Sequence, residues 1–301
     1  MANYYDENTL MYLNGSFVRA ADAHMDFYSQ SLHYGYSVFE GIRSYRTTNG
    51  TTRIFKPVEH FDRLKQSAAV INMPYEWTTD ELTSITYELL AKNQLEDAYI
   101  RPVVYAPANM TFTRNEHSYL LIQAWQMAPF LGEKLLRVRT SSFQRPNPQA
   151  FHMRAKAAGH YVNSIIASQE ARANGYDEAL LLDINGHVAE APGANVFMEK
   201  NGVLYTPPAG HILPGITRAT VIEIAAEMQL PVEEAPFKVS DMLQADAAFF
   251  CGTAVEVIGI ASLDDQPFAA KWETTKSAQI QKAYKERVTE PVKSSATIPV
   301  A

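Results

Sequence analysis

Two Asn-Gly dipeptides in the second half of the chain constrain the fold more than any other local feature. Asn185-Gly186 and Asn201-Gly202 each separate short segments rich in strand-forming residues. Asn-Gly between such segments is the strongest short-range signal for a β-hairpin, because both residues tolerate the positive φ that a tight turn requires. We therefore predict an antiparallel sheet from segments 179–183, 187–190, 195–199 and 203–206.

The rest of this half supplies further strands and helices. Gly175 follows the helical pattern that begins at about 161, as expected at a helix end. The predicted strands are 136–140, 247–250 and 257–263, and the predicted helices are 161–174, 217–229 and 271–288. The tail after Pro291 is expected to be loose.

The first third of the chain predicts a separate α+β unit. Asn14-Gly15 and Asn49-Gly50 indicate two more hairpins, and Pro57 is typical of a first helical turn. Thr78 and Glu81 have capping-box spacing, which predicts the start of a second helix. The expected strands are 11–13, 17–18, 39–45, 53–55, 98–105 and 118–125, with helices 57–71 and 79–92.

Between these units the periodic pattern lapses. We therefore expect a small N-terminal domain at 1–125, a linker at 126–135 and a larger domain at 136–301, in an α+β fold.

Charge favours a small-molecule partner. The formal net charge of the 301 residues is -7, without a basic block, which argues against nucleic acid and anionic membranes. The first ten residues do not resemble a signal peptide, and no apolar run approaches a membrane span. The one cysteine, Cys251, cannot form an internal disulfide, so we expect a cytoplasmic protein with a buried, inert thiol. No metal site is predicted.

Lys156 is the leading candidate for chemistry. It lies among small residues, in Ala155-Lys156-Ala157-Ala158-Gly159, ahead of a helical segment. A lysine that forms a Schiff base needs free approach by a flat cofactor, a dry pocket and an opposing carboxylate. Most lysines are solvated surface charges, so Lys156 gains weight only from residues further along the chain.

Glu190 is the candidate carboxylate. It ends a predicted strand before a rigid Pro192-Gly193 loop. A strand-end glutamate is usually solvated, but in a pyridoxal phosphate enzyme a carboxylate on the ring nitrogen keeps the nitrogen protonated. Glu190 is suited to that position.

Two glycine-threonine turns are candidate phosphate sites. Gly215-Ile216-Thr217 runs into a predicted helix, whose first N–H groups attract anions. Gly252-Thr253-Ala254 follows a buried strand and forms a second potential anion nest. A plain N-cap would also explain Thr217.

These residues, in this order and spacing, resemble the class IV aminotransferases. His33-Tyr34-Gly35, Phe39-Glu40-Gly41-Ile42-Arg43 and Ala98-Tyr99-Ile100-Arg101-Pro102 are similar to the branched-chain amino acid aminotransferases in particular. The resemblance extends over about 11–288. It implies the two-domain fold of that class, with a barrel-like antiparallel sheet in the large domain, and pyridoxal 5'-phosphate as cofactor.

The resemblance also implies a role for each matching residue. Lys156 would form the Schiff base and move the proton, Glu190 would pair with the ring nitrogen, and Tyr161 would bond the ring hydroxyl. The implied cofactor contacts are completed by Arg63, Leu213, Gly215, Ile216, Thr217, Gly252 and Thr253. The implied substrate contacts are Tyr34, Phe39, Gly41, Arg43, Arg101, Phe130, Thr253 and Ala254.

The implied activity is ping-pong transamination of L-leucine, L-isoleucine or L-valine with 2-oxoglutarate, in a homodimer or larger homo-oligomer. Phe130, His160 and Ala194 depart from the pattern of many relatives, which leaves side-chain preference open. Alternatives are a D-amino acid or amine transaminase, an aminodeoxychorismate lyase, or a non-catalytic protein that retains the cofactor for stability.

Overall fold

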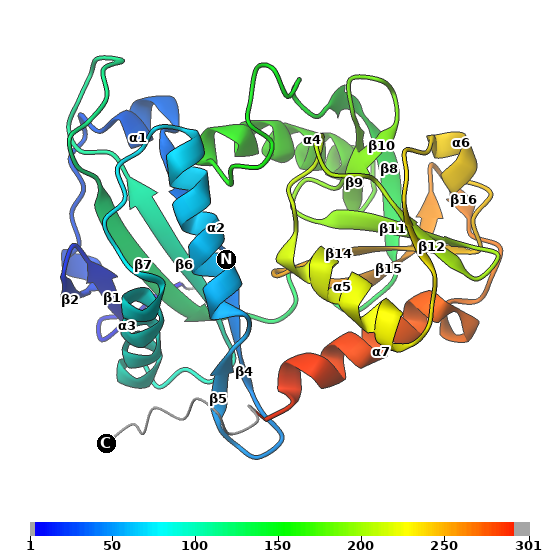
Figure 1. The fold of residues 1–301 in the computed structure, drawn as a ribbon, viewed down its shortest axis with the longest axis horizontal. Coiled ribbons are helices and arrows are strands. Elements are labelled where there is room, and N and C mark those ends of the chain that lie inside the picture. The colour runs from blue at the N-terminus through cyan, green and yellow to red at the C-terminus, as the bar shows by residue number, and fades with distance from the viewer. Residues whose placement is uncertain (1–3, 292–301) are drawn as a thin grey trace.

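The computed structural model describes residues 4–291, which form two sheets with helices packed on them (Figure 1). The first sheet has seven strands, and helices α2 and α3 lie on one of its faces. Its strands are β1 (Leu10–Leu13), β2 (Ser16–Arg19), β3 (Ser37–Phe39), β4 (Ile42–Arg46), β5 (Thr52–Ile54), β6 (Ala98–Tyr105) and β7 (Tyr119–Gln126). Its helices are α1 (Gln30–Tyr34), α2 (Pro57–Val70) and α3 (Thr79–Lys92).

The second sheet has nine strands and begins with β8, ten residues after the first sheet ends. Its strands are β8 (Leu136–Gln144), β9 (Glu178–Leu182), β10 (Val188–Glu190), β11 (Asn195–Lys200), β12 (Val203–Thr206), β13 (Val232–Glu234), β14 (Ala247–Gly252), β15 (Glu256–Leu263) and β16 (Gln266–Pro267). Its helices are α4 (Tyr161–Ala173), α5 (Ile216–Glu227), α6 (Val239–Met242) and α7 (Lys276–Thr289).

Part of the second sheet closes into a barrel. Strand β10 pairs with both β9 and β11, which completes the ring β8-β9-β10-β11-β14-β15. Glu190 and Asn195 face each other at this closure. A closed sheet has no free edge in the ring, so side chains at the junction have fixed positions.

The barrel differs in one respect from the predicted antiparallel sheet. Strand β8 runs parallel to both β9 and β15, so the sheet is mixed. The reason is that α4 connects β8 to β9, and a helical crossover returns the chain in the same direction. The four strands flanking the two Asn-Gly turns are antiparallel, as predicted.

Three of the local turn predictions can be checked by backbone angles. Asn14 and Gly15 have φ of 47° and 93°, and Asn201 and Gly202 have 52° and 78°, which are the two positive values of a type I′ turn. At Asn185-Gly186 only the glycine has positive φ, because Asp183 accepts N–H bonds from Asn185 and His187 and shapes a different turn.

The prediction of one continuous strand at 39–45 is wrong, because the strand is interrupted between the end of β3 at Phe39 and the start of β4 at Ile42. At the break, the Glu40 side chain is fully buried, in an ion pair with Arg63 and a hydrogen bond with His60. A Cβ on Gly41 would lie 2.0 Å from the Tyr99 hydroxyl oxygen. Burial of the carboxylate and close packing of the glycine therefore override the local strand pattern.

Helix ends largely follow the sequence signals. Helix α2 begins at Pro57, and Thr78 and Glu81 form the predicted capping box of α3. The last helix begins later than predicted, at Lys276 rather than 271. Its start is fixed by Thr275 as N-cap and by the buried Glu199 carboxylate, which accepts N–H bonds from Lys276 and Ser277.

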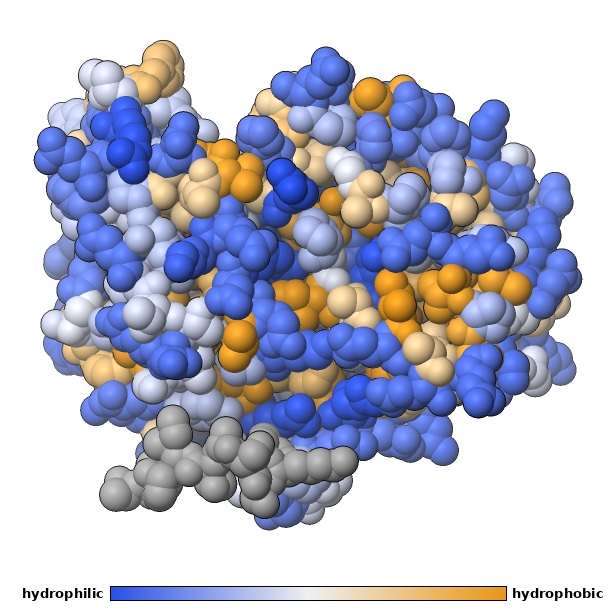
Figure 2. Space-filling view, viewed as in Figure 1, coloured by the Kyte–Doolittle hydropathy of each residue, from blue (hydrophilic) through white to orange (hydrophobic). Residues whose placement is uncertain are grey.

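Figure 2 shows a largely hydrophilic face with smaller apolar areas between the polar side chains. Within 4–291 no helix combines the length and apolar character needed to cross a membrane. In the same range no group of three or more His, Cys, Asp or Glu side chains is arranged to hold a metal ion. Cys251 is fully buried, as predicted, and burial raises the pKa of its thiol. The predicted loose tail lies outside the described residues.

Candidate active site

One cavity brings together most of the residues singled out from the sequence. All ten predicted cofactor contacts line it, together with three predicted substrate contacts. Thr253 is predicted in both roles, so these contacts come from twelve residues. They are Lys156, Arg63, Tyr161, Glu190, Leu213, Gly215, Ile216, Thr217, Gly252, Thr253, Gly41 and Ala254. Arg63 and Gly41 come from the first half of the chain and the others from the second, so the cavity lies where the two halves meet.

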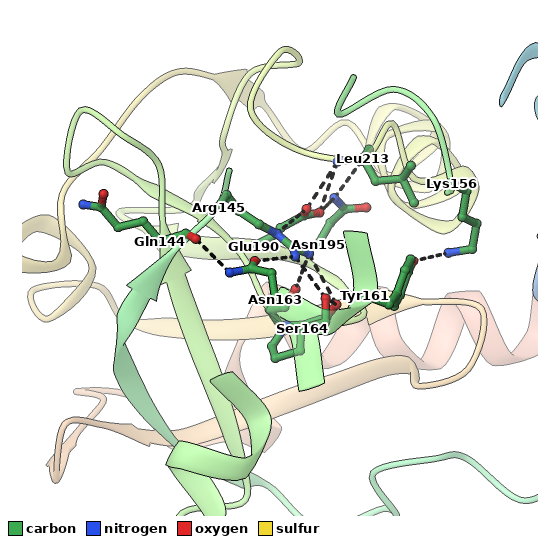
Figure 3. A network of polar contacts seen from close by, with 11 residues as sticks. Gln144, Arg145, Lys156, Tyr161, Asn163, Ser164, Glu190, Asn195 and Leu213 are labelled. Carbon is green, nitrogen blue, oxygen red and sulfur yellow. Dashed lines mark hydrogen bonds and ion pairs between the residues drawn. The ribbon is translucent and has the colours of Figure 1, made fainter. Parts of the chain in front are cut away.

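The Lys156 amine is held at one side of the cavity. Its Nζ donates a hydrogen bond of 2.7 Å to the hydroxyl of Tyr161, the first residue of α4 (Figure 3). The Lys156 backbone is fixed by the first half of the chain, since its N–H donates to Ser67 Oγ and its carbonyl accepts from Phe39 N. The flanking Ala155 and Ala157 are buried, as a lysine that faces a cavity requires.

Glu190 lies in the same cavity and is 3% exposed. Arg145 Nε is 2.9 Å from its Oε1, Asn195 Nδ2 donates to Oε2 at 3.1 Å, and the Leu213 N–H approaches at 3.3 Å (Figure 3). Burial raises the pKa of the Glu190 carboxyl, and the Arg145 cation and the Leu213 N–H oppose that rise. The carboxylate is thus buried, paired and oriented.

The N-terminus of α5 lines the cavity wall and is a candidate anion site. Gly215 is the N-cap, and no side chain caps the first N–H groups of the helix. Thr217 is the second residue of α5, so the simpler interpretation of Thr217 as N-cap does not hold. A Cβ on Gly215 would lie 1.9 Å from Asn195 Oδ1, so a side chain here would displace Asn195 or the first turn of the helix. The free N–H groups and the helix dipole favour a phosphate.

Arg63 adds a cation beside this helix. Its Nε and Nη2 bind both oxygens of Glu40 at 2.7 and 2.8 Å, and Nη1 donates to the Pro214 carbonyl. One N–H on each Nη atom then has no hydrogen-bond partner among residues 4–291. Burial alone would raise the pKa of Glu40, but Arg63 and His60 outweigh it and hold that pKa well below its usual range.

Two further predicted substrate residues stack at the edge of the cavity. The Arg101 guanidinium lies 4.6 Å from the Phe39 ring centroid and donates to the Tyr99 hydroxyl at 3.1 Å. Phe39 also contacts Tyr161, with ring centroids 4.8 Å apart. Tyr99 itself lines the cavity, so Phe39 and Arg101 lie directly behind or beside lining residues.

Three other predicted substrate residues lie away from the cavity lining. Tyr34 is 46% exposed and packs on Phe112. Arg43 is buried, with Nη2 donating to the Met127 carbonyl and Nη1 3.6 Å from Glu256. Phe130 is 62% exposed, and its N–H donates to the Ala254 carbonyl.

The sequence did not reveal four residues that shape the site: Glu40, Tyr99, Arg145 and Asn195. Arg145 stands before Pro146 in a loop, where arginines are usually solvated, and its partner Glu190 is distant in sequence. Asn195 had one detectable signal, its position opposite Glu190 in the predicted pair of strands.

The cavity thus combines the Glu190 carboxylate at the barrel closure, the Lys156 amine and the N-terminus of α5. Comparison of the sequence with known protein families identifies the class of protein that has this site. Residues 37–263 match the family model for amino-transferase class IV. The chain belongs to the class IV aminotransferases.

Individual relatives narrow the family. A branched-chain-amino-acid aminotransferase of Pseudomonas aeruginosa is 39% identical over 285 residues, 93% of this chain and 92% of the relative. Within class IV, the chain belongs to the branched-chain-amino-acid aminotransferase family.

Solved structures agree. The branched-chain aminotransferase of Thermoproteus uzoniensis, solved with norvaline, aligns with a TM-score of 0.90 at 35% identity, over 93% of this chain and 95% of the other. The branched-chain aminotransferase of Thermobaculum terrenum in its PLP form aligns with a TM-score of 0.88 at 34% identity, over 94% and 95%.

Proposed function

We propose that this protein is a branched-chain-amino-acid transaminase, which transfers the amino group of L-leucine, L-isoleucine or L-valine to 2-oxoglutarate. The single observation that carries the proposal is the presence of Lys156, Glu190 and the α5 N-terminus around one cavity, in a chain of this family.

The residues fit pyridoxal 5'-phosphate, the cofactor of class IV aminotransferases. A buried carboxylate is available for a protonated ring nitrogen, and Tyr161 for a ring hydroxyl. The uncapped start of α5, Thr217, Thr253 and the remaining N–H groups of Arg63 suit a phosphate. When bound, the cofactor supplies an aldehyde for amine exchange and a ring that takes up electrons as the substrate's alpha proton leaves.

Lys156 is the group that moves the proton. Its amine is held at 2.7 Å from the Tyr161 hydroxyl, on a backbone fixed from both halves of the protein. From there the amine would take up the alpha proton of the amino acid and hold it within the cavity for return. Proton transfer by a positioned base contributes about 10² to 10⁴ in rate.

The other residues bind and orient. Phe39 offers an apolar ring for a branched side chain, and Arg101, stacked on that ring, offers a cation for the distal carboxylate of glutamate or 2-oxoglutarate. The Thr253-Ala254 turn would receive the carboxylate common to both substrates through its backbone N–H groups. One site can then accept an apolar and an acidic substrate in alternate half-reactions.

The proposal is tested by the absorption spectrum of the purified protein with its cofactor. Addition of L-leucine should convert the aldehyde form to the amine form, and 2-oxoglutarate should restore it. A rate panel of L-leucine, D-alanine and a chiral amine separates the related class IV activities. Faster conversion by D-alanine or by the amine, or no conversion by any of them, would contradict the proposal.

We also propose that the protein is a homodimer or a larger homo-oligomer in the cytoplasm. Support for self-association comes from large exposed aromatic side chains, namely Phe27, Tyr28 and Phe112, at 78%, 67% and 89% exposure. The reduced thiol expected of Cys251 agrees with a cytoplasmic location. Light scattering after size exclusion should give twice the 33.7 kDa chain mass or a higher multiple, and a stable monomer would contradict this.

A further inference from the structure

Arg145 is the one buried cation in direct contact with the Glu190 carboxylate among the described residues. It follows β8, is 8% exposed, and places Nε 2.9 Å from Glu190 Oε1. The contact is an ion pair rather than a well-aligned hydrogen bond. Electrostatic attraction at this distance between buried groups is strong, and loss of one partner would leave the other charge uncompensated.

The rest of the Arg145 guanidinium holds the loop that follows Glu190. Nη1 donates to Ser164 Oγ at 3.0 Å, and Nη2 approaches the carbonyls of Ala191 and Pro192 at 3.2 and 3.3 Å. Ser164 in turn donates to the Pro192 carbonyl at 2.6 Å. The Arg145 backbone N–H is bonded to the Leu182 carbonyl at the end of β9 (2.8 Å). Arg145 is therefore fixed by β9, by α4 and by the loop itself. Figure 3 shows its guanidinium between Ser164 and Glu190.

We propose that Arg145 is a positioning residue for the reaction: its guanidinium keeps the Glu190 carboxylate charged and aimed into the cavity, so that the carboxylate can hold the proton of the cofactor ring nitrogen. This inference rests on the proposed function. Burial raises the pKa of Glu190, and Arg145 is the largest influence that opposes it; Leu213 N–H and Lys156 act in the same direction. Without Arg145 the proton would move from the ring nitrogen to the carboxylate, and the ring would take up electrons less well.

The first test uses protein free of cofactor, so it does not depend on the proposed activity. The unfolding free energy of wild type, Arg145→Gln, Glu190→Gln and the double variant is measured from pH 5 to pH 8. A buried acid whose pKa is raised favours folding at low pH and loses that contribution as pH rises through its folded pKa. The difference in unfolding free energy between Arg145→Gln and wild type should therefore grow as pH rises. This pH dependence should vanish when Arg145→Gln is compared with Arg145 in the Glu190→Gln background. A difference that still grows with pH in the absence of Glu190 would overturn the proposal.

The second test is kinetic. Arg145→Gln should lower kcat about 100-fold with little change in KM for L-leucine, and Arg145→Lys should restore about tenfold of that loss. The effects of Arg145→Gln and Glu190→Gln should not multiply, because both act on the same proton. The proposal would be overturned if the effects of the two changes on kcat multiply in the double variant. It would also be overturned if Arg145→Gln has the wild-type kcat per cofactor-loaded molecule.

Two variants serve as controls. Arg139→Gln makes the same change on β8, the strand that precedes Arg145, beside Tyr176 and outside the cavity, and should leave kcat unchanged. If Arg145→Gln does not fold, Arg145→Lys with and without Glu190→Gln decides the question by the same two criteria. If the wild-type protein does not transaminate but the pH-dependent stability of Arg145→Gln still depends on Glu190, the proposed function is rejected. The conclusion that Arg145 controls the charge of Glu190 is then retained.

Discussion

At the scale of single residues, the Tyr161 hydroxyl is the contact most directly tied to the reactive amine. It accepts a hydrogen bond from Lys156 Nζ at 2.7 Å. A hydrogen bond contributes about 0.5–1.5 kcal/mol, so Tyr161→Phe should lower kcat by about 2- to 10-fold. Tyr176→Phe, which removes an exposed hydroxyl bonded to Asp265, is the matched control. A wild-type kcat in Tyr161→Phe would show that this contact does not assist the amine.

Glu40 gives a prediction about stability and pH. It is completely buried with Arg63 and His60, and these partners lower its pKa despite burial. Removal of one member of a buried ion pair costs about 3–5 kcal/mol, so Glu40→Gln should be less stable by about 3 kcal/mol at pH 7.

The sign of the pH effect follows from the lowered pKa. The stability that Glu40 contributes is complete above its unfolded pKa of about 4.3 and is lost as pH falls toward its folded pKa. Urea unfolding should therefore show a gap between wild type and Glu40→Gln that narrows below about pH 4. Glu88→Gln, at an exposed pair with Lys92, should change stability by less than about 1 kcal/mol. A gap independent of pH would contradict the account.

The sequence indicated site residues that lie in a recognisable local motif. It did not indicate site residues whose role depends on an ion-pair partner far away in the sequence. Lys156 stands among small residues ahead of a helical segment, and Thr217 comes two residues after Gly215 at a predicted helix start. These local features, taken together with Glu190 further along the chain, carried the family resemblance that implied their roles. The partners of Arg145 and Glu40 come from other elements, and a single charged residue in a loop or strand does not indicate which charge it will meet.

At the scale of elements, the start of α5 is the feature that joins fold to cofactor binding. Gly215→Ala would place a Cβ 1.9 Å from Asn195 Oδ1, and that amide also supports Glu190. Asn195 or the first turn of the helix must then shift. We expect cofactor affinity to fall at least about tenfold, a change of about 1.4 kcal/mol, in a titration of cofactor-free protein. An unchanged Kd would mean that the helix start does not hold the phosphate.

Elements defined by local signals were predicted well from the residues themselves, whereas strand pairing was not, and the barrel-like sheet was predicted only through the family resemblance. The hairpin at Asn14-Gly15, the capping box of α3 and the end of α4 at Ala173, before the C-cap Asn174, follow from neighbouring residues alone. The barrel closure through β10 and the parallel setting of β8 depend on strands that meet from distant parts of the chain. No local pattern records which strand a given segment will pair with.

At the scale of the whole molecule, the site depends on the two halves staying together. Arg43 of β4 donates to the Met127 carbonyl in the segment between the sheets and lies 3.6 Å from Glu256 of β15. Arg43→Ala should lower the unfolding free energy by about 1–3 kcal/mol, since Lys285 still pairs with Glu256. Arg46→Ala, an exposed change on the same strand, should lower it by less than about 1 kcal/mol. Equal effects of the two changes in urea unfolding would contradict a role for Arg43 between the halves.

The most direct measurement of the central claim is borohydride reduction of the protein with its cofactor, followed by peptide mass spectrometry. Reduction makes the bond between a lysine and the cofactor permanent, so the modified peptide identifies the lysine. The account predicts the added mass on Lys156 alone, and none after prior treatment with L-leucine. Modification of a different lysine, or of none, would contradict it.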